Sequence, residues 1–176
     1  MSQRESGYER VAFDQYETPA WATRALVPHI PERVRNIWEP ACGSGKMVAE
    51  LSRTHSVGGT DIQSGEDFFS TQGYGGDAII TNPPYSIAQE FIEHALELTM
   101  ADSGFVAMLL RCDFDHAKTR RHLFSNHAAF AKKLVLTKRI RWIEDSKGSP
   151  SFNHAWYLFD WQHRGSPSLA YHFEER

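Results

Sequence analysis

The feature that most constrains the fold is a regular alternation of short apolar segments with segments of helical periodicity. Val34–Trp38, Val57–Ile62 and Asp77–Thr81 are short and mostly apolar, and turns or helical patterns separate them. Phe105–Leu110 is a continuous apolar run, which is typical of a central strand covered on both faces. Strands that alternate with helices predict an α/β fold built on a mostly parallel sheet.

The segments between these strands predict the helices. Thr18 and Pro19 are typical of an N-cap and a first helical residue, so we expect a helix that extends to Leu26. Apolar residues recur at helical spacing over Lys46–Arg53 and again over Ser86–Met100. Two further helices are therefore expected.

The last third of the chain is expected to complete the sheet. Leu134–Leu136 and Ala155–Phe159 predict a final pair of strands, joined by the polar loop Asp145–Phe152. No internal repeat is found, and a chain of 176 residues suits one domain. We expect residues 16–176 to form that domain and the polar residues 1–15 to be flexible.

Composition excludes several classes of function. No apolar run approaches the roughly 18 residues that a membrane span needs, and the polar N-terminus lacks the apolar stretch of a secretory signal. Cys42 and Cys112 lie far apart without metal-ligand spacing, and the histidines are scattered along the chain. We therefore expect a cytoplasmic protein with reduced thiols, without a metal site and without membrane association.

Charge is distributed unevenly along the chain, although the net formal charge is only −3. Residues 1–110 hold 7 Lys and Arg against 15 Asp and Glu, whereas residues 111–147 hold 10 against 4. An acidic body with one basic segment suits a protein that meets phosphate groups with a single face. A solvated helix face would produce the same excess, so charge alone leaves both interpretations open.

A glycine-rich turn, Glu39–Gly45, follows the first expected strand. Glycines at this place let the backbone approach a ligand at the start of the next helix. A phosphate-binding P-loop would need a glycine at Pro40 and Ser or Thr at Met47, and a dinucleotide fingerprint would need a small residue at Val48. Both patterns are absent from the turn. A shorter ligand-binding turn and a tight strand-to-helix turn without a ligand remain as interpretations.

Acidic residues follow the second expected strand. Asp61 lies at its end, sixteen residues after Gly45, where a carboxylate can accept hydrogen bonds from both hydroxyls of a ribose. Asp67, Phe68 and Phe69 come next, and they suit the amine and the ring face of an adenine. A turn-forming Asp61 and a loop Asp67 beside two core aromatics are the alternatives.

The tetrapeptide Asn82-Pro83-Pro84-Tyr85 directly follows the third expected strand. Two consecutive prolines remove two backbone donors and fix two φ angles, so Asn82 and the neighbouring carbonyls are held rigidly. Acceptors on both hydrogens of an aromatic amine make its nitrogen more tetrahedral and direct its lone pair at an electrophile. Asn82 Oδ1 and the Pro83 carbonyl can be these acceptors, and Tyr85 can stack on a base. The alternative is a proline-rich turn after an edge strand.

Together these motifs resemble those of the adenine-N6 methyltransferases over residues 14–160, in the group whose cofactor motifs precede the catalytic one. Tyr16–Pro19 resembles the upstream cofactor motif of that family, Glu39–Gly45 its glycine motif, and Asn82–Tyr85 its catalytic tetrapeptide. The resemblance implies an α/β, Rossmann-like class I methyltransferase fold with a mostly parallel seven-stranded sheet, a C-terminal antiparallel hairpin and helices on both faces. It also implies S-adenosyl-L-methionine as the cofactor and the N6 amine of adenine as the methyl acceptor.

The resemblance assigns roles to individual residues. The implied catalytic residues are Asn82, Pro83, Pro84 and Tyr85. The implied cofactor-binding residues are Tyr16, Thr18, Pro19, Glu39, Pro40, Ala41, Cys42, Gly43, Gly45, Asp61, Ile62, Asp67, Phe68 and Asn82.

The candidate substrate residues include the catalytic Tyr85 and residues from the last third of the chain. Phe152 occupies the place where the family offers a second aromatic to a base flipped out of the duplex, and Trp142 is a rival for that place. Further candidates are basic residues that would contact phosphates. They are Lys118, Arg120, Arg121, Lys132, Lys133, Lys138, Arg139 and Arg141.

Nothing in the sequence corresponds to the separate target-recognition domain that DNA-specific relatives in this family carry, and the compact form resembles phage and prophage products. We expect DNA as the substrate, with a specificity that is short or absent, comes from the basic segment, or needs a homodimer or a partner subunit. An RNA adenine methyltransferase is the main alternative. An inactive cofactor-binding partner subunit conflicts with the intact tetrapeptide, and a protein glutamine methyltransferase leaves the basic segment without a use.

Overall fold

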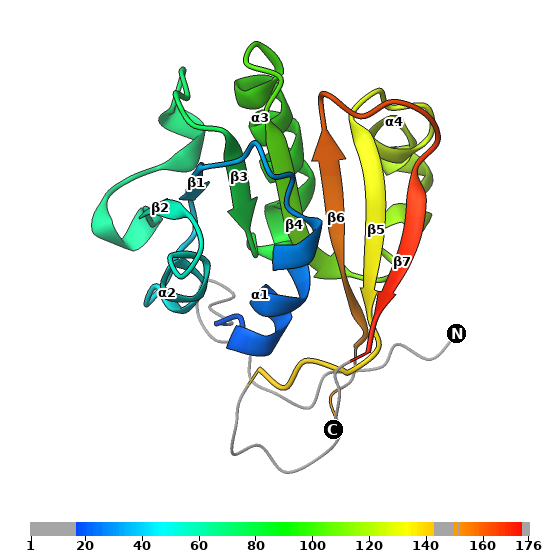
Figure 1. Ribbon diagram of the computed structural model, residues 1–176, viewed down its shortest axis with the longest axis horizontal. Helices are drawn as coiled ribbons and strands as arrows, with labels where there is room; N and C mark the ends of the chain where they lie inside the picture. Colours follow the sequence, from blue (N-terminus) through cyan, green and yellow to red (C-terminus); the bar gives the residue numbers. More distant parts are fainter. Residues whose placement is uncertain (1–16, 143–149, 151, 174–176) are drawn as a thin grey trace.

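The computed structural model describes residues 17–142, 150 and 152–173, which form an α/β structure around one seven-stranded sheet (Figure 1). The strand order across the sheet is β2-β1-β3-β4-β6-β5-β7. The strands are β1 (Asn36–Glu39), β2 (Ser56–Gly59), β3 (Ala78–Thr81), β4 (Phe105–Arg111), β5 (Phe130–Leu136), β6 (His154–Asp160) and β7 (Ser168–His172). The expected flexibility of residues 1–15 and the expected role of Tyr16 lie outside the described residues.

Within the described sheet, only β6 runs against the other strands. β1 pairs in parallel with β2 and β3, β3 pairs in parallel with β4, and β5 pairs in parallel with β7. β6 lies antiparallel between β4 and β5, and with β5 it forms the expected antiparallel hairpin. The predictions of a mostly parallel sheet and of a hairpin near its end are therefore confirmed.

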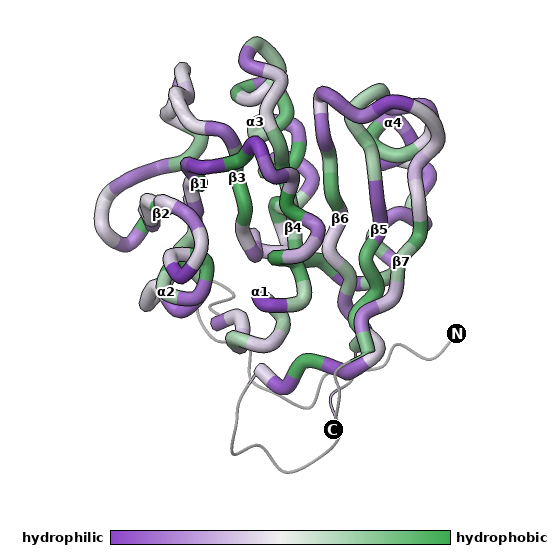
Figure 2. The backbone as a smooth tube through the Cα atoms, viewed as in Figure 1, coloured by the Kyte–Doolittle hydropathy of each residue, from purple (hydrophilic) through white to green (hydrophobic). Residues whose placement is uncertain are grey.

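β4 is buried on both faces of the sheet, and Figure 2 shows hydrophobic residues along much of β3 and β4. Its side chains alternate between two cores. Phe105 and Leu109 pack in one core, whereas Val106 and Leu110 pack in the other. Each large apolar side chain buried in this way stabilises the fold by roughly 1.5–3 kcal/mol. The predicted doubly covered strand over Phe105–Leu110 is confirmed.

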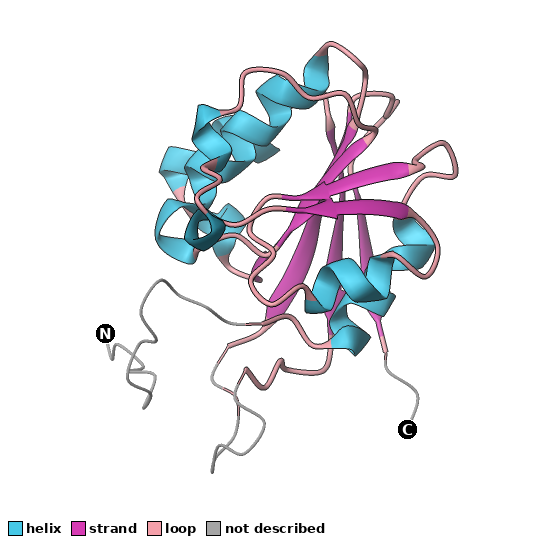
Figure 3. Cartoon of the chain, turned by 90° about the vertical axis from the view of Figure 1, so that its left-hand side faces the viewer, coloured by secondary structure: helices cyan, strands magenta, loops and turns pink. Residues whose placement is uncertain are grey.

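Helices cover both faces of the sheet, as expected (Figure 3). The helices are α1 (Ala20–Leu26), α2 (Lys46–Leu51), α3 (Ala88–Met100) and α4 (Arg121–Phe124). Leu26 of α1 and Leu51 of α2 enter the first core, and Phe91 of α3 and Leu123 of α4 enter the second. None of the helices in the described part of the chain is both long and apolar enough to cross a bilayer.

α1 begins at Ala20, one residue later than the sequence predicts. Its N-cap is Pro19, whose backbone is extended and whose carbonyl accepts a hydrogen bond from the Ala22 N–H at 2.9 Å. The prediction of Thr18 as N-cap was wrong, because the extended Pro19 separates Thr18 from the first turn and no side chain caps the helix. α1 is held to the sheet by Trp156 of β6, whose Nε1 donates to the Ala22 carbonyl at 2.9 Å.

Two strands differ from the expectation. β2 ends at Gly59, so Asp61 does not end a strand; it is instead the N-cap of a short 3-10 helix, η3 (Ile62–Ser64). The resemblance implied seven strands, but the residues of β7 were not assigned to one; β7 completes the sheet beside β5. Leu169 and Tyr171 of β7 are exposed, so this strand lacks the buried apolar run by which the inner strands were recognised.

Candidate active site

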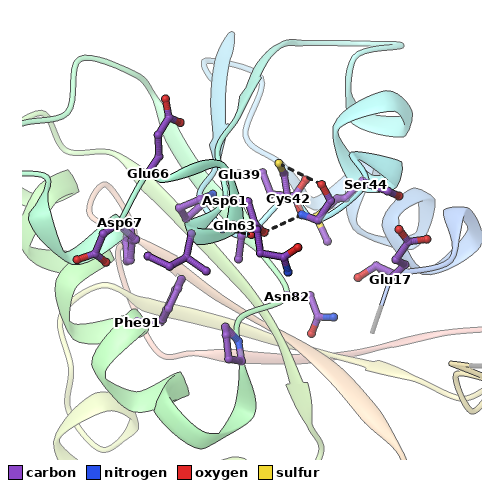
Figure 4. A pocket seen from close by; sticks show the side chains of 18 of the residues that line it. Glu17, Glu39, Cys42, Ser44, Asp61, Gln63, Glu66, Asp67, Asn82 and Phe91 are labelled. Carbon is purple, nitrogen blue, oxygen red and sulfur yellow. Dashed lines mark hydrogen bonds between the residues drawn. The ribbon is translucent and has the colours of Figure 1, made fainter. Parts of the chain in front are cut away.

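The candidate residues gather at the carboxyl ends of the parallel strands β1, β2 and β3. β2 lies on one side of β1 and β3 lies on the other, so the strand order reverses direction at β1. Open α/β sheets bind ligands at such a switch point. Glu39, Asp61 and Asn82 end or follow these strands, and all three line one pocket of about 610 Å³ (Figure 4).

The turn after β1 depends on two glycines in left-handed conformations. Gly43 has φ +51° and Gly45 has φ +84°, in a region that residues with a Cβ rarely adopt. The Gly45 N–H donates to the Cys42 carbonyl at 2.8 Å, and α2 begins directly after Gly45. A Cβ at Gly59 of β2 would lie 2.7 Å from Val48 Cγ2, so β2 approaches the start of α2 closely. The sequence analysis did not single out this last glycine.

Asp61 fastens the glycine-rich turn to the end of β2. Its Oδ2 accepts a hydrogen bond from the Gly43 N–H at 2.9 Å, and its Oδ1 accepts one from the Gln63 N–H at 3.0 Å. A carboxylate offers about four lone-pair sites, so each oxygen keeps acceptor capacity for the hydroxyl of a ligand. The half-buried Asp61 therefore shapes the turn and can still bind at the pocket wall.

Glu39 places a buried carboxyl group at the same wall. It is 3% exposed. Burial raises its pKa to about 8; a backbone hydrogen bond from Val48 opposes the rise, and the negative charge of Asp61 adds to it. Among the described residues Oε2 has no hydrogen-bond partner. A buried acceptor without a partner costs roughly 1–3 kcal/mol, so Glu39 is suited to a hydrogen-bond donor on a ligand.

Large apolar side chains in the wall of the pocket are exposed to solvent. Ile62, Phe69 and Ile87 line it and are 58%, 41% and 38% exposed. Figure 4 shows Asp67 and Phe91 toward one end of the pocket, and Glu17 and Asn82 toward the other. Open apolar side chains in a concave wall with few polar groups are typical of a site for a small organic ligand.

Asp67 and Phe68 line the pocket but have structural partners of their own. The Asp67 carboxylate accepts hydrogen bonds from the Phe69 N–H at 3.1 Å and from Ser70 Oγ at 3.0 Å. Phe68 is buried, with its ring stacked on Phe91 at 4.7 Å between centroids. The ring that remains open toward a ligand is that of Phe69, which was expected to suit the ring face of an adenine but was not among the implied cofactor-binding residues.

Glu17 joins the segment before α1 to the glycine-rich turn. Its carboxylate lies 2.6 Å from Lys46 Nζ. Hydrogen bonds from Lys46 and then from Ser44 lower its pKa below the ordinary value. All three residues line the pocket, and none was predicted. Glu17 stands inside the motif Tyr16–Pro19, so its neighbours in that motif were the one signal that could have identified it.

The tetrapeptide carries the chain from β3 into the pocket. Asn82 and Pro84 line the pocket, whereas the buried Pro83 and the half-buried Tyr85 are not among its lining residues. The Pro84 carbonyl accepts a hydrogen bond from the Ile87 N–H at 3.1 Å, which closes the short 3-10 helix η5 (Tyr85–Ile87). The Asn82 side chain is thus fixed between a buried strand and a rigid turn.

The two rival aromatics have different neighbours. Trp142 packs edge-on against His154 at the start of β6, with 5.1 Å between ring centroids, and the same histidine lies 6.0 Å from the Tyr85 ring. Phe152 instead lies under the Arg111 guanidinium, whose Cζ is 4.1 Å from the centroid of the Phe152 ring. Tyr85, His154 and Trp142 therefore form one contiguous group of rings. No role was expected for His154, because the spacing of the histidines along the chain does not distinguish one of them.

The structure brings most of the expected cofactor residues into one pocket. Those that line it are Thr18, Glu39, Pro40, Ala41, Cys42, Gly43, Asp61, Ile62, Asp67, Phe68 and Asn82. Pro19 and Gly45 are not among the lining residues and instead shape the adjoining backbone. Lining residues that the sequence analysis left out of the site are Glu17, Ser44, Lys46, Met47, Gln63, Glu66, Phe69, Ile87 and Phe91.

The basic residues divide into groups with different surroundings. Lys133 is ion-paired with Asp115 at 2.8 Å and is largely enclosed, so it stabilises the fold rather than meeting solvent. Lys132 Nζ lies 3.2 Å from His29 Nδ1. Lys118 and Arg120 belong to the 3-10 helix η7 (Lys118–Arg120), and Arg121 begins α4. α4 ends at Phe124, which packs on Phe130 at the start of β5.

Lys138, Arg139 and Arg141 follow the carboxyl end of β5, at the edge of the sheet that holds the pocket. Arg139 Nε donates to Asn153 Oδ1 at 2.9 Å, and Lys138 Nζ lies 5.1 Å from the Trp21 ring centroid. We call this segment, residues 138–141, the basic loop. Of the candidate phosphate contacts, these three lie at the carboxyl ends of the parallel strands, on the same side of the sheet as Asn82.

No cluster of three or more metal-ligating side chains occurs among the residues whose placement is described. No family model matches the sequence, and no curated protein matches it.

Solved structures resemble this fold at low sequence identity. A proposed RNA methyltransferase from Pyrococcus horikoshii matches with a TM-score of 0.61 and 13% identity, over 88% of this chain and 91% of its own. The modification subunit of a proposed type I restriction enzyme from Vibrio vulnificus YJ016 matches with a TM-score of 0.58 and 15% identity, over 87% of this chain and 45% of its own. This chain has the Rossmann-like class I methyltransferase fold.

The type IIG restriction endonuclease BpuSI matches with a TM-score of 0.53 and 13% identity, over 85% of this chain and 24% of its own. This chain therefore spans less than half the length of the two restriction proteins. The methyltransferase fold is common to all three neighbours, whereas their overall size is not.

Proposed function

We propose that this chain is an S-adenosyl-L-methionine-dependent methyltransferase that methylates the exocyclic N6 amine of adenine in DNA. The observation that carries the proposal is the single pocket that extends from the glycine-rich turn to Asn82. Its position at the switch point of a methyltransferase fold supports a cofactor there, and Asn82 at its wall supports an amine as the group that reacts.

The lining residues fit the proposed cofactor group by group. Asp61 has acceptor capacity for ribose hydroxyls, and the open side chains of Ile62 and Phe69 suit the two faces of an adenine ring. The unpartnered Oε2 of Glu39 suits the ammonium group of the amino-acid end. When bound, S-adenosyl-L-methionine supplies a methyl group on a positively charged sulfur. The chain itself must hold the acceptor amine in line with that methyl group.

Asn82 and the prolines after it would activate the acceptor. An adenine amine is a poor nucleophile because its lone pair is delocalised into the ring. Asn82 Oδ1 and the Pro83 carbonyl would accept its two hydrogens and favour a tetrahedral nitrogen. Because these oxygens are fixed before the reaction, they stabilise the positive charge that develops on nitrogen without reorganisation. Alignment contributes further, and no strong general base is required.

The proposed substrate must deliver its base out of the duplex, because pairing hides the amine. Tyr85 would then stack on the flipped base, an interaction worth about 1–3 kcal/mol. The basic loop lies at the same edge of the sheet, which favours a polyanionic substrate over a protein amide. The preference for DNA over RNA rests on the resemblance of the motifs to DNA adenine methyltransferases.

The test is transfer of a labelled methyl group from the cofactor to duplex DNA. Asn82→Ala should lower kcat by roughly 10²–10³-fold, because it removes one preorganised acceptor, while cofactor binding measured by calorimetry is largely kept. Gln162→Ala, an exposed amide outside the pocket, is the matched control and should transfer at the wild-type rate. If RNA becomes labelled while single-stranded and duplex DNA both stay unlabelled, the substrate is RNA and not DNA. An Asn82→Ala enzyme as active as wild type would overturn the proposed chemistry.

A further inference from the structure

His154, the first residue of β6, is a buried histidine beside the tetrapeptide that the proposed chemistry does not use. Its side chain is 1% exposed. Neither Nδ1 nor Nε2 has a well-formed hydrogen bond to another described residue. Burial of polar nitrogens without partners destabilises a protein, so such an arrangement in a folded chain indicates a functional role.

The surroundings of His154 keep the imidazole neutral. Its pKa falls to about 4, mainly because burial disfavours the imidazolium and then because of the positive charge of Arg111 on the neighbouring strand. The negative charge of Asp113 and the backbone of Phe152 oppose this shift but do not reverse it. A neutral imidazole presents one N–H donor and one nitrogen acceptor. At neutral pH His154 can therefore form directional hydrogen bonds without carrying charge.

The ring neighbours of His154 connect it with the place where a substrate base would lie. Its ring lies 6.0 Å from Tyr85 at a tilt of 33° and 5.1 Å from Trp142 in an edge-on contact. Both aromatic residues are half-buried. Because the imidazole neighbours both rings, a planar base held between Tyr85 and Trp142 would lie next to the imidazole edge.

We propose that His154 is a specificity-determining residue, whose N–H donates a hydrogen bond to a ring nitrogen of the target base held against Tyr85. This inference rests on the proposed function, because it needs a base as the substrate. A site built to hydrogen-bond one group of a substrate rejects an analogue that lacks the group, because its own polar atom is then left unpaired. His154 thus selects the base that Asn82 activates.

The experiment combines an analogue series with a variant. Duplexes in which every adenine is replaced by 1-deaza-, 3-deaza- or 7-deazaadenine keep the reactive amine and each lose one ring nitrogen. For the wild-type enzyme, one of the three replacements should lower kcat/KM about tenfold, as expected for an unpaired donor. In His154→Phe the same replacement should have no further effect, because the donor is already absent. The ratio between the two enzymes isolates the hydrogen bond from general changes in base pairing.

The second measurement is the thermal stability of the free protein. His154→Phe should keep or raise the Tm while it lowers transfer to natural DNA, because it removes two buried nitrogens without well-formed hydrogen bonds and keeps a planar ring. A histidine needed only for packing would instead lose stability and activity together. His163→Phe is the matched control, since His163 Nε2 also lacks a described partner but lies beyond the far end of β6. If His154→Phe does not fold, His154→Asn takes its place in the same series.

The outcomes separate this inference from the proposed function. If the wild-type enzyme methylates no adenine-containing polymer, both the proposed function and this inference are overturned. Wild-type enzyme that methylates DNA but accepts all three deaza bases equally overturns the role of His154 alone. A His154→Phe enzyme with wild-type kcat/KM and the same response to the analogues overturns it as well.

Discussion

Two buried ionisable side chains lie at one edge of the sheet, Glu39 at the end of β1 and His154 at the start of β6. The glutamate stays protonated over a wide range of pH because its folded-state pKa is about 8. In the unfolded chain its carboxyl group ionises near 4.5, so unfolding releases a proton between these two values. The contribution of Glu39 to stability is therefore present below pH 4.5 and is lost as pH rises through 8.

Glu39→Gln should remove this pH dependence from the free protein. Denaturant melts at several pH values should show the variant gaining stability relative to wild type between pH 5 and pH 8.5, on the order of 3 kcal/mol. The exposed Glu97→Gln is the control, and its profile should run parallel to that of wild type. A constant difference between Glu39→Gln and wild type across this range would contradict the assigned burial of the charge.

Residues recognised by their place in a motif were predicted from the sequence, whereas residues defined by contacts between distant elements were not. Asp61 and Asn82 follow strands at fixed places, so their arrival at one pocket follows from the parallel sheet. Lys46 and Glu17 meet only because α1 packs beside α2. His154 is distinguished from the other histidines by the burial of both its nitrogens, which no local pattern encodes.

Among the elements, α1 has a double attachment that positions the segment before it. Trp156 of β6 anchors it through the Ala22 carbonyl, and Lys138 of the basic loop lies over Trp21. The segment that leads into α1 contributes Glu17 and Thr18 to the pocket. The position of one pocket wall therefore depends on how firmly α1 is held.

Trp156→Phe should loosen this attachment. The variant loses the indole N–H and leaves a small cavity, so it should be destabilised by roughly 1–3 kcal/mol in denaturant melts. Cofactor affinity measured by calorimetry should weaken as well, because Glu17 and Thr18 move with α1. Asp77→Ala is the matched comparison: it removes acceptors of the Arg35 and Asn36 N–H groups at the opposite edge of the sheet. Weakened cofactor binding in Asp77→Ala to the same degree would show that general instability, not α1, is responsible.

Among the secondary-structure elements, the inner strands could be predicted from the sequence, whereas the outermost strand β7 could not. The unbroken apolar run Phe105–Leu110 predicts a buried strand. β7 pairs on one side only and keeps Leu169 and Tyr171 exposed, so its sequence resembles that of a loop. The start of α1 was misplaced because Thr18-Pro19 satisfies a capping pattern although Thr18 is buried at the pocket.

Across the whole molecule, the sequence gathers positive charge into one segment and the fold then divides that segment. The basic loop, residues 138–141, lies at the edge of the sheet that holds the pocket. The residues around the start of α4 instead precede Phe124, which packs on Phe130 at the start of β5. The sequence predicted which residues are basic, but only the path of the chain through β5 separates the two groups.

The division predicts unequal effects on nucleic-acid binding. Arg139→Ala combined with Arg141→Ala should weaken binding to DNA and reduce the slope of log affinity against log salt concentration by about 0.9 for each phosphate that is no longer neutralised. Lys118→Ala combined with Arg121→Ala removes the same charge elsewhere and should change affinity and slope much less. Fluorescence anisotropy over a salt series measures both quantities. Equal decreases in affinity for the two double variants would mean that net charge alone sets the affinity.

The proposed reaction is methyl transfer, by Asn82 and the pocket beside it, to the N6 amine of adenine in DNA. Its most direct test is mass spectrometry of nucleosides released from DNA and from RNA after incubation with the protein and S-adenosyl-L-methionine. We expect N6-methyldeoxyadenosine from DNA with the wild-type protein and little or none with Asn82→Ala. Methylated cytidine, a methylated nucleoside from RNA alone, or no methylated nucleoside from either polymer would contradict it.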